Sequence, residues 1–319
     1  MKKFLGLLGV ALAVVSHAQE DLSGKLNVFH AGSLAVPFKQ ISAAFMQRHP
    51  QVEILLEAAG SRDCARKISE LNRPCDVFAS ADYLVIDQLL IPAHAEWNIK
   101  FAANEMCIVY HQASRRSPEL TADNWFEILM DPKVAFGRAN PNADPCGYRA
   151  VLTLQLAERH YQKPGLAEAM LQKDGAFIRP KETDLLALLE TGTIDYLFLY
   201  RSVAVQHGLR TLILPDQINL KSAALAEHYR TASVELTGKK PGAVIVQRGE
   251  PMVYGITIPK KAPNRAVAEA FVAYVLSAAG GLHVLEALGQ PTVVPSVCAS
   301  WERLPESLKP FARKPPICP

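Results

Sequence analysis

Four short polar stretches in apolar surroundings carry the residue types that could do chemistry in this chain. Each follows a run typical of a strand and precedes a run typical of a helix. The first backbone N–H groups of a helix lack partners and lie at the positive end of the peptide dipole, so several converging helix starts would surround an anion. The pattern therefore indicates capture of an oxyanion by residues 30–34, 59–62, 140–149 and 179–184.

The alternation of strand-like and helix-like runs predicts how these stretches are positioned. Residues 26–30 read as a strand, and apolar residues then recur at helical spacing over 34–45. The same unit of strand, polar turn and helix returns at 52–71. It occurs again in the second half, where the strand-like run 194–200 leaves Tyr200 at its carboxyl end. Such alternation favours a parallel α/β sheet whose ligand lies beyond the carboxyl ends of the strands. Two serines precede these helices and are predicted N-caps, Ser33 and Ser61.

Two further apolar runs are placed to connect two lobes. Residues 101–111 form one predicted strand that carries the chain into a second lobe, and 253–258 form another that returns it. Residues 215–249 are harder to interpret, with one clear strand at 244–246. The Pro- and Lys-rich tail from residue 301 reads as surface coil.

The first residues are typical of a secretory signal peptide. Met1-Lys2-Lys3 is followed by the apolar run 4–15 and by Ser16-His17-Ala18, which predicts cleavage after Ala18. The apolar run is shorter than the roughly 20 residues that cross a bilayer. The residue directly after the cleavage point is not cysteine, so a lipid anchor there is not indicated. No later stretch reads as a membrane helix. We therefore expect residues 1–18 to be removed and the protein to be soluble in the periplasm.

The composition is that of an ordinary globular protein. The 319 residues are 49% hydrophobic and 20% charged, which allows two domains with real cores. The formal net charge of +3 includes Lys2 and Lys3 of the predicted signal peptide, so the remaining chain is nearly neutral. A nearly neutral chain has no bulk charge with which to hold nucleic acid, and we expect no such partner.

Six cysteines permit disulfides in an exported chain without requiring them. The sequence-local candidates are Cys64 with Cys75 and Cys298 with Cys318, although the first pair would need Cα atoms within about 7 Å across a helix-like segment. Cys146 lies beside a polar stretch, but nothing near it in sequence supplies a base, so we expect a small buried thiol. Neither the cysteines nor the nine histidines have metal-ligand spacing.

Seven phrases of the sequence resemble the substrate-binding proteins of molybdate/tungstate ABC importers, in the branch that binds both oxyanions. They are HAGSL, AGSR, DVFASADY, NPNADPCGYRA, RPKETDLLALLETG, DYLFLYRSVAVQH and GEPMVYGIT, and the similarity runs from about residue 26 to residue 295. The resemblance implies the α/β, type II periplasmic-binding-protein fold, with two lobes, two crossover strands and the ligand in the cleft. We accordingly expect one lobe from 19–106 and 251–319 and the other from 107–250.

The resemblance also implies what the protein does and which residues bind the ligand. A monomer without a cofactor would capture molybdate or tungstate and deliver it to the membrane permease of an ABC importer. In that branch two carboxylates approach the metal at the centre of the oxyanion, and Asp144 and Glu182 occupy those places here. The ligand-binding residues implied in full are Gly32, Ser33, Ser61, Asn142, Ala143, Asp144, Glu182 and Tyr200.

Elementary chemistry favours the same two oxyanions independently of the family resemblance. Molybdate and tungstate are dianions near neutral pH, and a closed cleft must replace their water with fixed N–H and O–H donors. Ser33, Ser61 and Tyr200 are such donors, and they need no Lys or Arg counter-charge. Carboxylates would repel an oxyanion whose central atom is inaccessible. Asp144 and Glu182 would therefore discriminate against sulfate and phosphate, whose centres take no further oxygen ligands.

Plainer interpretations of the same residues stay open. Each serine could be only an N-cap, Asp144 only a turn residue, Glu182 only a carboxylate at a helix start, and Tyr200 only interface packing. Two arginines lie close to the site in sequence, and surface salt bridges are the commoner use of such residues: Arg149 and Arg201.

Other functions also stay open. An enzyme would need a nucleophile or an acid–base pair, and the chain has no G-x-S-x-G, P-loop, H-E-x-x-H or G-x-G-x-x-G motif. We expect no catalysis, although paired carboxylates could do acid–base work. The main alternative is a binding protein for sulfate, phosphate or a small organic acid, and a periplasmic sensor without a transporter is another. Tungstate and molybdate are not ranked, because they differ little in size and share their charge.

Overall fold

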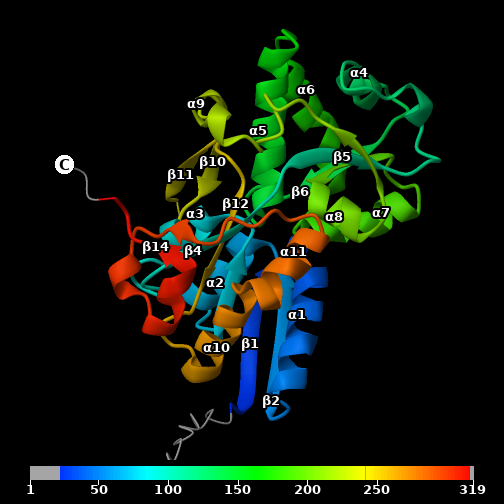
Figure 1. Ribbon diagram of the computed structural model, residues 1–319. Helices are drawn as coiled ribbons and strands as arrows, with labels where there is room; N and C mark the ends of the chain where they lie inside the picture. Colours follow the sequence, from blue (N-terminus) through cyan, green and yellow to red (C-terminus); the bar gives the residue numbers. More distant parts are fainter. Residues whose placement is uncertain (1–21, 241, 317–319) are drawn as a thin grey trace, which may run out of the picture.

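Residues 22–240 and 242–316 are described by the structure, a computed structural model, and they contain two five-stranded sheets (Figure 1). The first sheet has the strand order β2-β1-β3-β12-β4. Strand β1 runs parallel to β2 and β3, whereas β12 runs antiparallel to β3 and β4. We call this sheet and its helices the first lobe. Its strands are β1 (Gly24–Ala31), β2 (Val52–Ala59), β3 (Val77–Ser80), β4 (Ile99–Ala103) and β12 (Val253–Thr257).

The helices of the first lobe hold the turns that follow its strands. Helix α1 buries one face, on which Phe38 and Phe45 recur at helical spacing. Both rings meet Phe271 of α10 edge to face, with ring centroids 6.3 and 5.3 Å apart. This packing fixes the start of α1 at the carboxyl end of β1. The helices are α1 (Ala35–Arg48), α2 (Ser61–Ser69), α3 (Tyr83–Val85), α10 (Arg265–Val275) and α11 (His283–Ala287).

The second sheet, with its helices, forms the second lobe and has the order β7-β6-β8-β5-β9. Strand β6 runs parallel to β7 and β8, and β5 runs antiparallel to β8 and β9. Its strands are β5 (Met106–Tyr110), β6 (Phe136–Ala139), β7 (Ile178–Arg179), β8 (Tyr196–Tyr200) and β9 (Arg210–Ile213). Its helices are α4 (Trp125–Met130), α5 (Pro145–His160), α6 (Leu166–Lys173), α7 (Leu186–Glu190) and α8 (Arg201–Gln206).

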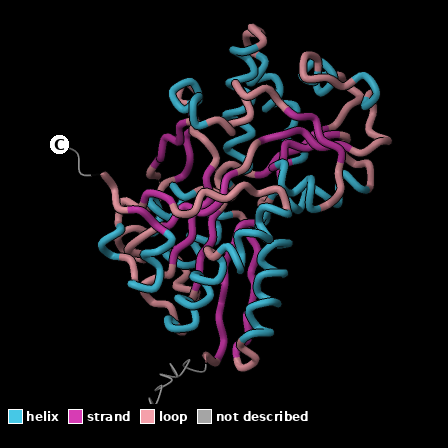
Figure 2. The backbone as a smooth tube through the Cα atoms, in the orientation of Figure 1, coloured by secondary structure: helices cyan, strands magenta, loops and turns pink. Residues whose placement is uncertain are grey.

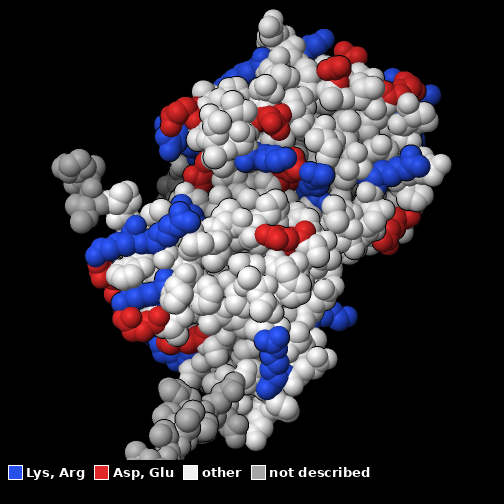
Figure 3. Space-filling model, viewed as in Figure 1, with Lys and Arg blue, Asp and Glu red and all other residues white. Residues whose placement is uncertain are grey.

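The chain passes between the lobes from β4 to β5 and returns into β12. Figures 1 and 2 show the first lobe below and the second above, with these segments running between them. Before the return, α9 (Ala226–Tyr229) precedes an antiparallel hairpin of β10 (Ser233–Thr237) and β11 (Val244–Arg248). On the face in Figure 3, basic and acidic side chains are interspersed.

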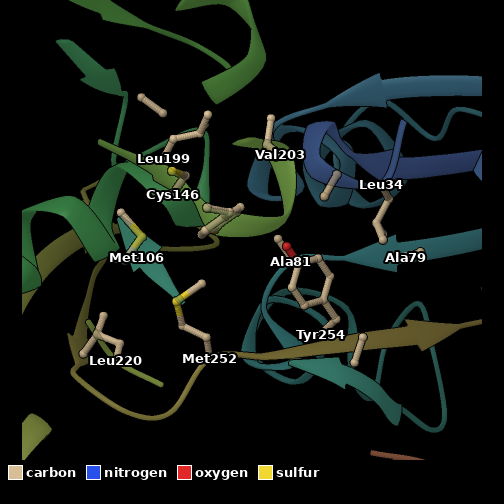
Figure 4. Packing of buried hydrophobic residues seen from close by; sticks show 14 of the residues in the cluster. Leu34, Ala79, Ala81, Met106, Cys146, Leu199, Val203, Leu220, Met252 and Tyr254 are labelled. Carbon is tan, nitrogen blue, oxygen red and sulfur yellow. The ribbon is translucent and has the colours of Figure 1, made fainter. Parts of the chain in front are cut away.

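The larger of two apolar clusters in the described chain spans both lobes, and the smaller lies within the first lobe. The larger cluster includes Leu34 and Ala79 of the first lobe and Cys146 and Leu199 of the second. Figure 4 shows this packing, with Tyr254 of β12 lying among residues of the cluster. The lobes are therefore in direct contact along the edge where both sheets present their loops.

The predicted α/β architecture is confirmed, with three differences in detail. The sheets are mixed rather than parallel, because β5 and β12 enter from the opposite lobe. The predicted strand at 101–111 is two strands, separated at Asn104 and Glu105. The tail is not only coil, because β14 (Ala312–Arg313) pairs with β13 (Ser296–Val297) and Leu308 is buried. The lobe boundaries at 106/107 and 250/251 stay a prediction.

Several smaller expectations concern residues far from the cleft. Cys64 and Cys75 are buried and free, so the structure lacks the first candidate disulfide, while Cys318 of the second lies outside the described residues. The predicted signal peptide, 1–18, also lies outside them. Within the described part of the chain, no single helix is long and apolar enough to cross a membrane. One bent pair, Arg265–Val275 with Ala278–Ala287, meets those requirements only when taken together.

Candidate functional site

The four polar stretches meet where the two lobes touch. A Cβ atom on Gly32 would lie 2.8 and 2.9 Å from the two carboxylate oxygens of Glu182, which belongs to the other lobe. A Cβ atom on Gly60 would lie only 2.3 Å from the carbonyl oxygen of Ala143. All three distances are shorter than carbon and oxygen tolerate. At position 60 the neighbouring atom is backbone, so glycine is required for the lobes to approach this closely, whereas a side chain at position 32 would displace the end of the Glu182 side chain.

Glu182 is the least satisfied polar group of this region. Its side chain is buried, and neither carboxylate oxygen meets a donor at hydrogen-bonding geometry among the described residues. Burial, and then the negative charge of Asp144, raise the pKa of Glu182 well above its usual value. The backbone N–H groups of Ser33 and of Glu182 itself oppose that shift. A buried acceptor without a donor is costly unless another group meets it.

Asp144 joins two of the polar stretches. Its Oδ1 accepts a hydrogen bond of 2.8 Å from the Cys146 N–H, which caps the start of α5. Its Oδ2 accepts one of 2.9 Å from the N–H of Glu182. Asp144 is buried, so its carboxylate is held at the junction of the loops before α5 and α7. Asp144 is therefore the N-cap of α5, a role that the sequence did not predict, and each oxygen keeps a second lone pair for another partner.

The two serines are fully buried, and neither caps its helix. Ser33 Oγ lies 2.9 Å from the hydroxyl oxygen of Tyr254, a pair in which either group could donate, and the Tyr254 oxygen accepts from Asn104 Nδ2 at 2.9 Å. Ser61 Oγ accepts a bond of 3.0 Å from the backbone N–H of Ala81. The N-cap predictions were wrong because both side chains have tertiary partners. The Ser61 hydroxyl hydrogen stays free to donate to a further acceptor.

Asn142 connects the second lobe to α2 and to the hairpin. Its Oδ1 accepts from the Thr237 N–H at 2.8 Å, and its carbonyl accepts from Arg66 Nη1 at 2.8 Å and from Arg62 Nε at 3.3 Å. Its own N–H donates to Asn140 Oδ1. The carbonyl, the N–H and the Oδ1 of Asn142 thus have protein partners in this structure.

Ala143 reaches across to the start of α2. Its carbonyl accepts from the N–H groups of Arg62 and Asp63 at 3.1 and 3.3 Å, and its own N–H donates to the Asn140 carbonyl. Two of the helix-start amides expected to meet an anion are therefore occupied by the opposite lobe. The buried guanidinium of Arg62 lies beside this contact.

Tyr200 is held by an arginine that the sequence did not place there. Arg149 Nη1 donates to the Tyr200 hydroxyl oxygen at 3.0 Å and to the Ala81 carbonyl at 2.7 Å, and Arg149 Nη2 lies 3.3 Å from Asp82 Oδ2. Arg149 is 2% exposed, so the expectation of a surface salt bridge was wrong. For Arg201 it is confirmed, because this exposed side chain pairs with Glu105 at 2.7 Å.

Sequence reasoning missed the buried arginines and their carboxylate partner. The phrases DVFASADY and NPNADPCGYRA contain Asp82 and Arg149, but an isolated Asp or Arg in a loop carries no local sign of burial. The sequence predicts that the hydroxyl donors need no Lys or Arg counter-charge, and the structure places the Arg149 guanidinium 3.0 Å from the Tyr200 hydroxyl. The buried, free thiol expected at Cys146 is confirmed, and burial raises its pKa well above the usual value.

The arrangement combines hydrogen-bond donors with carboxylates. Hydroxyls from both lobes and the carboxylates of Asp144 and Glu182 lie at one interface, which suits a polar ligand that offers both acceptor oxygens and an electron-poor centre. In the described residues, no group of three His, Cys, Asp or Glu side chains is placed to hold a metal ion.

Comparison with known sequences gives a consistent result. The family model for the bacterial extracellular solute-binding protein matches residues 26–282. A relative from Petrotoga mobilis, named an uncharacterized solute-binding protein, is 46% identical over 312 residues, covering 98% of this chain and 97% of the relative. The molybdate/tungstate-binding protein WtpA of Pyrococcus abyssi is 37% identical over 346 residues, covering 96% of this chain and 97% of that protein.

Solved structures resemble the architecture at low sequence identity. The periplasmic molybdate-binding protein of Azotobacter vinelandii has a TM-score of 0.61 and 16% identity, over 85% of this chain and 99% of that chain. The sulfate-binding protein SubI of Mycobacterium tuberculosis has a TM-score of 0.61 and 12% identity, over 84% and 87%. At such identities the likeness shows the fold alone. The predicted type II periplasmic-binding fold is confirmed.

Proposed function

The chain belongs to the bacterial extracellular solute-binding protein family, and we propose that within it this protein captures molybdate or tungstate and delivers the oxyanion to an ABC importer. The relatives that match over nearly the whole chain include proteins named for molybdate and tungstate. The predicted family resemblance is thereby confirmed at the level of sequence, while the ligand of this chain is our proposal.

The observation that carries the proposal is the unsatisfied carboxylate of Glu182. Both of its oxygens are buried without a hydrogen-bond donor from the described part of the chain, beside a second carboxylate, at a junction otherwise built from donors. A simple tetrahedral oxyanion would be repelled by this group. A molybdenum or tungsten centre can accept further oxygen ligands, so Asp144 and Glu182 would approach it and complete its shell, while hydroxyls hold the oxyanion oxygens.

The remaining residues take roles consistent with their contacts. The hydroxyls of Ser33, Ser61 and Tyr200 donate to the oxyanion oxygens. Gly32 keeps the first lobe within reach of the ligand because it has no side chain. Two residues form the wall that presents Asp144 and binds the first lobe, Asn142 and Ala143.

The wider setting of the proposal follows the family. We propose that the protein works in the periplasm as a monomer after loss of residues 1–18, with lobes of 19–106 plus 251–319 and of 107–250. It carries its ligand as cargo rather than as a cofactor, docks on a membrane permease and has no catalytic role.

Calorimetric titration of the protein with sodium tungstate, molybdate, sulfate and phosphate tests the function directly. We expect tight binding of the first two and at least about a hundredfold weaker binding of the others, since repulsion by a buried carboxylate is worth several kcal/mol. Sulfate or phosphate binding as tightly as tungstate would contradict the proposal and support the alternative of a general oxyanion carrier.

The Glu182→Gln variant tests the carboxylate role. It removes the charge without removing any hydrogen bond that the side chain makes. We expect tungstate affinity to fall by about tenfold or more and the preference over sulfate to narrow, because a charged contact is replaced by a weaker neutral one. The control is Glu158→Gln on the outer part of α5, where the carboxylate only accepts from the Ala167 N–H. Unchanged selectivity in Glu182→Gln would refute this role.

A further inference from the structure

We propose that Arg149 is a positioning residue that holds the two lobes together and fixes the Tyr200 hydroxyl so that its hydrogen faces the bound anion. This inference rests on the proposed function, since the anion is the acceptor that the hydroxyl meets. Arg149 itself need not touch the ligand.

Arg149 crosses from one lobe to the other. It lies in the second turn of α5, which belongs to the second lobe, and its guanidinium bonds Ala81 and Asp82 at the end of β3 in the first lobe. The side chain is 2% exposed, and Asp82 is 1% exposed. A buried ion pair between separate bodies forms fully only when those bodies meet, because each charge alone would have to be solvated.

The partner carboxylate is itself immobilised. Asp82 Oδ1 accepts from the Leu84 N–H at 2.9 Å, which caps α3. Its Oδ2 accepts from the hydroxyl of Tyr148 at 2.5 Å and faces Arg149. The Oδ1 atom of Asp82 is thus bonded within the first lobe. Its Oδ2 atom contacts two consecutive residues of the second lobe, Tyr148 and Arg149.

The same guanidinium determines the direction of the Tyr200 hydroxyl. Arginine has donors only, so the Tyr200 oxygen must be the acceptor in their 3.0 Å bond. The hydroxyl hydrogen then points away from Arg149 and needs an acceptor elsewhere. A neutral residue at position 149 would leave that hydrogen free to turn away from the ligand.

One residue of the first lobe, Ala81, contacts both Arg149 and the hydroxyl group of Ser61. Its carbonyl accepts from Arg149, and its N–H donates to Ser61 Oγ at 3.0 Å. Ser61 and Tyr200 are therefore both acceptors for fixed protein donors, and each keeps its hydrogen for another partner. Closing the lobes onto Arg149 would fix a donor hydroxyl on each side of the ligand in the same step.

A double-mutant cycle with sodium tungstate tests the link between Arg149 and Tyr200. The variants are Arg149→Met, Tyr200→Phe and the double substitution, each measured by calorimetry and by stopped-flow dissociation. We expect each single change to weaken binding about 10- to 100-fold, mainly through faster dissociation, and the double variant to be no more than about twofold weaker than the weaker single variant. Additive losses, or no loss in Arg149→Met, would overturn the inference.

Two further variants keep the test decisive. Arg201→Met removes a neighbouring but exposed arginine, and we expect its tungstate affinity to match that of the wild type. If Arg149→Met does not fold, Asp82→Asn removes the charge across the lobes and should speed tungstate dissociation, whereas unchanged dissociation would overturn the inference. Absence of tungstate and molybdate binding by the wild-type protein would instead defeat the proposed function, so the two failures are distinguishable.

Discussion

At the scale of single residues, the site is defined by groups whose needs are only partly met by the protein. Within residues 22–240 and 242–316, Glu182 has no donor for either carboxylate oxygen, while Ser61 and Tyr200 accept from fixed donors and keep their own hydrogens. Asp144 uses one lone pair of each oxygen for the backbone. Such groups raise the energy of the folded protein unless a ligand meets them, which is how binding sites differ from the core.

The carboxyl of Glu182 should make stability depend on pH. Its pKa in the folded protein is raised above the value of about 4.5 expected in the unfolded chain, so between those two values the folded protein binds the extra proton. Stability contributed through this group is therefore lost as pH rises. In the ligand-free protein, Glu182→Gln should melt above the wild type at pH 8, by roughly 2–4 °C for each kcal/mol relieved.

Thermal melts between pH 4.5 and pH 8 check this prediction. The advantage of Glu182→Gln should shrink toward pH 4.5, where the wild-type carboxyl is protonated in the folded protein and already about half protonated in the unfolded chain. An advantage of the same size across the whole range would show that the charge of Glu182 is not its source.

At the scale of elements, the turns of the strand–turn–helix units both contribute the proposed ligand contacts and form the surfaces along which the two lobes meet. The turn after β2 meets the loop before α5 so closely that Ala143 satisfies two N–H groups of α2. The turn after β1 likewise meets the loop that carries Glu182. Short turns at the carboxyl ends of parallel strands therefore serve both as ligand contacts and as the surfaces along which the lobes join.

The Gly60→Ala variant tests whether close contact between the lobes is needed for ligand binding. The backbone at Gly60 has φ −56° and ψ 137°, which alanine adopts readily, so folding of the first lobe should be unaffected. The added methyl group would lie 2.3 Å from the Ala143 carbonyl oxygen and hold the lobes apart. We expect tungstate affinity to fall by about a hundredfold, since misplacing site groups by about 1 Å is costly.

Calorimetry, together with small-angle scattering of the tungstate-saturated protein, checks the Gly60 prediction. Gly175→Ala is the matched control, because a Cβ atom there would meet nothing within 4 Å. Unchanged affinity and compactness in Gly60→Ala would mean that the close approach at Gly60 is not needed for binding.

At the scale of the whole molecule, one apolar cluster spans both lobes while their polar loops face each other. Long-range hydrogen bonds join the lobes at Arg149, at Ala143 and at the hairpin residue Thr237, whose carbonyl accepts from Arg62 Nη2. A ligand held by groups from both lobes would add to this set of contacts. Binding should therefore stabilise the molecule as a unit.

Tungstate should raise the melting temperature in proportion to the logarithm of its concentration. A ligand at about 1,000 times its dissociation constant adds roughly 4 kcal/mol to stability if it binds only the folded protein. Differential scanning fluorimetry with sodium tungstate, and with sodium sulfate as the comparison salt, measures this effect. Equal shifts with both salts would indicate a general salt effect rather than a site.

The sequence by itself determined the order of most strands and helices and the polar stretches at strand ends, and the resemblance of seven phrases indicated the family. The strands, helices and turns follow from local rules, because periodicity and turn chemistry involve residues a few positions apart. Local rules could not give the partners of Ser33, Ser61 or Arg149. Ser33 meets Tyr254 across 221 positions and Arg149 meets Ala81 across 68. Only the tertiary structure decided these contacts, because burial and pairing of a polar side chain depend on which distant segments pack against it.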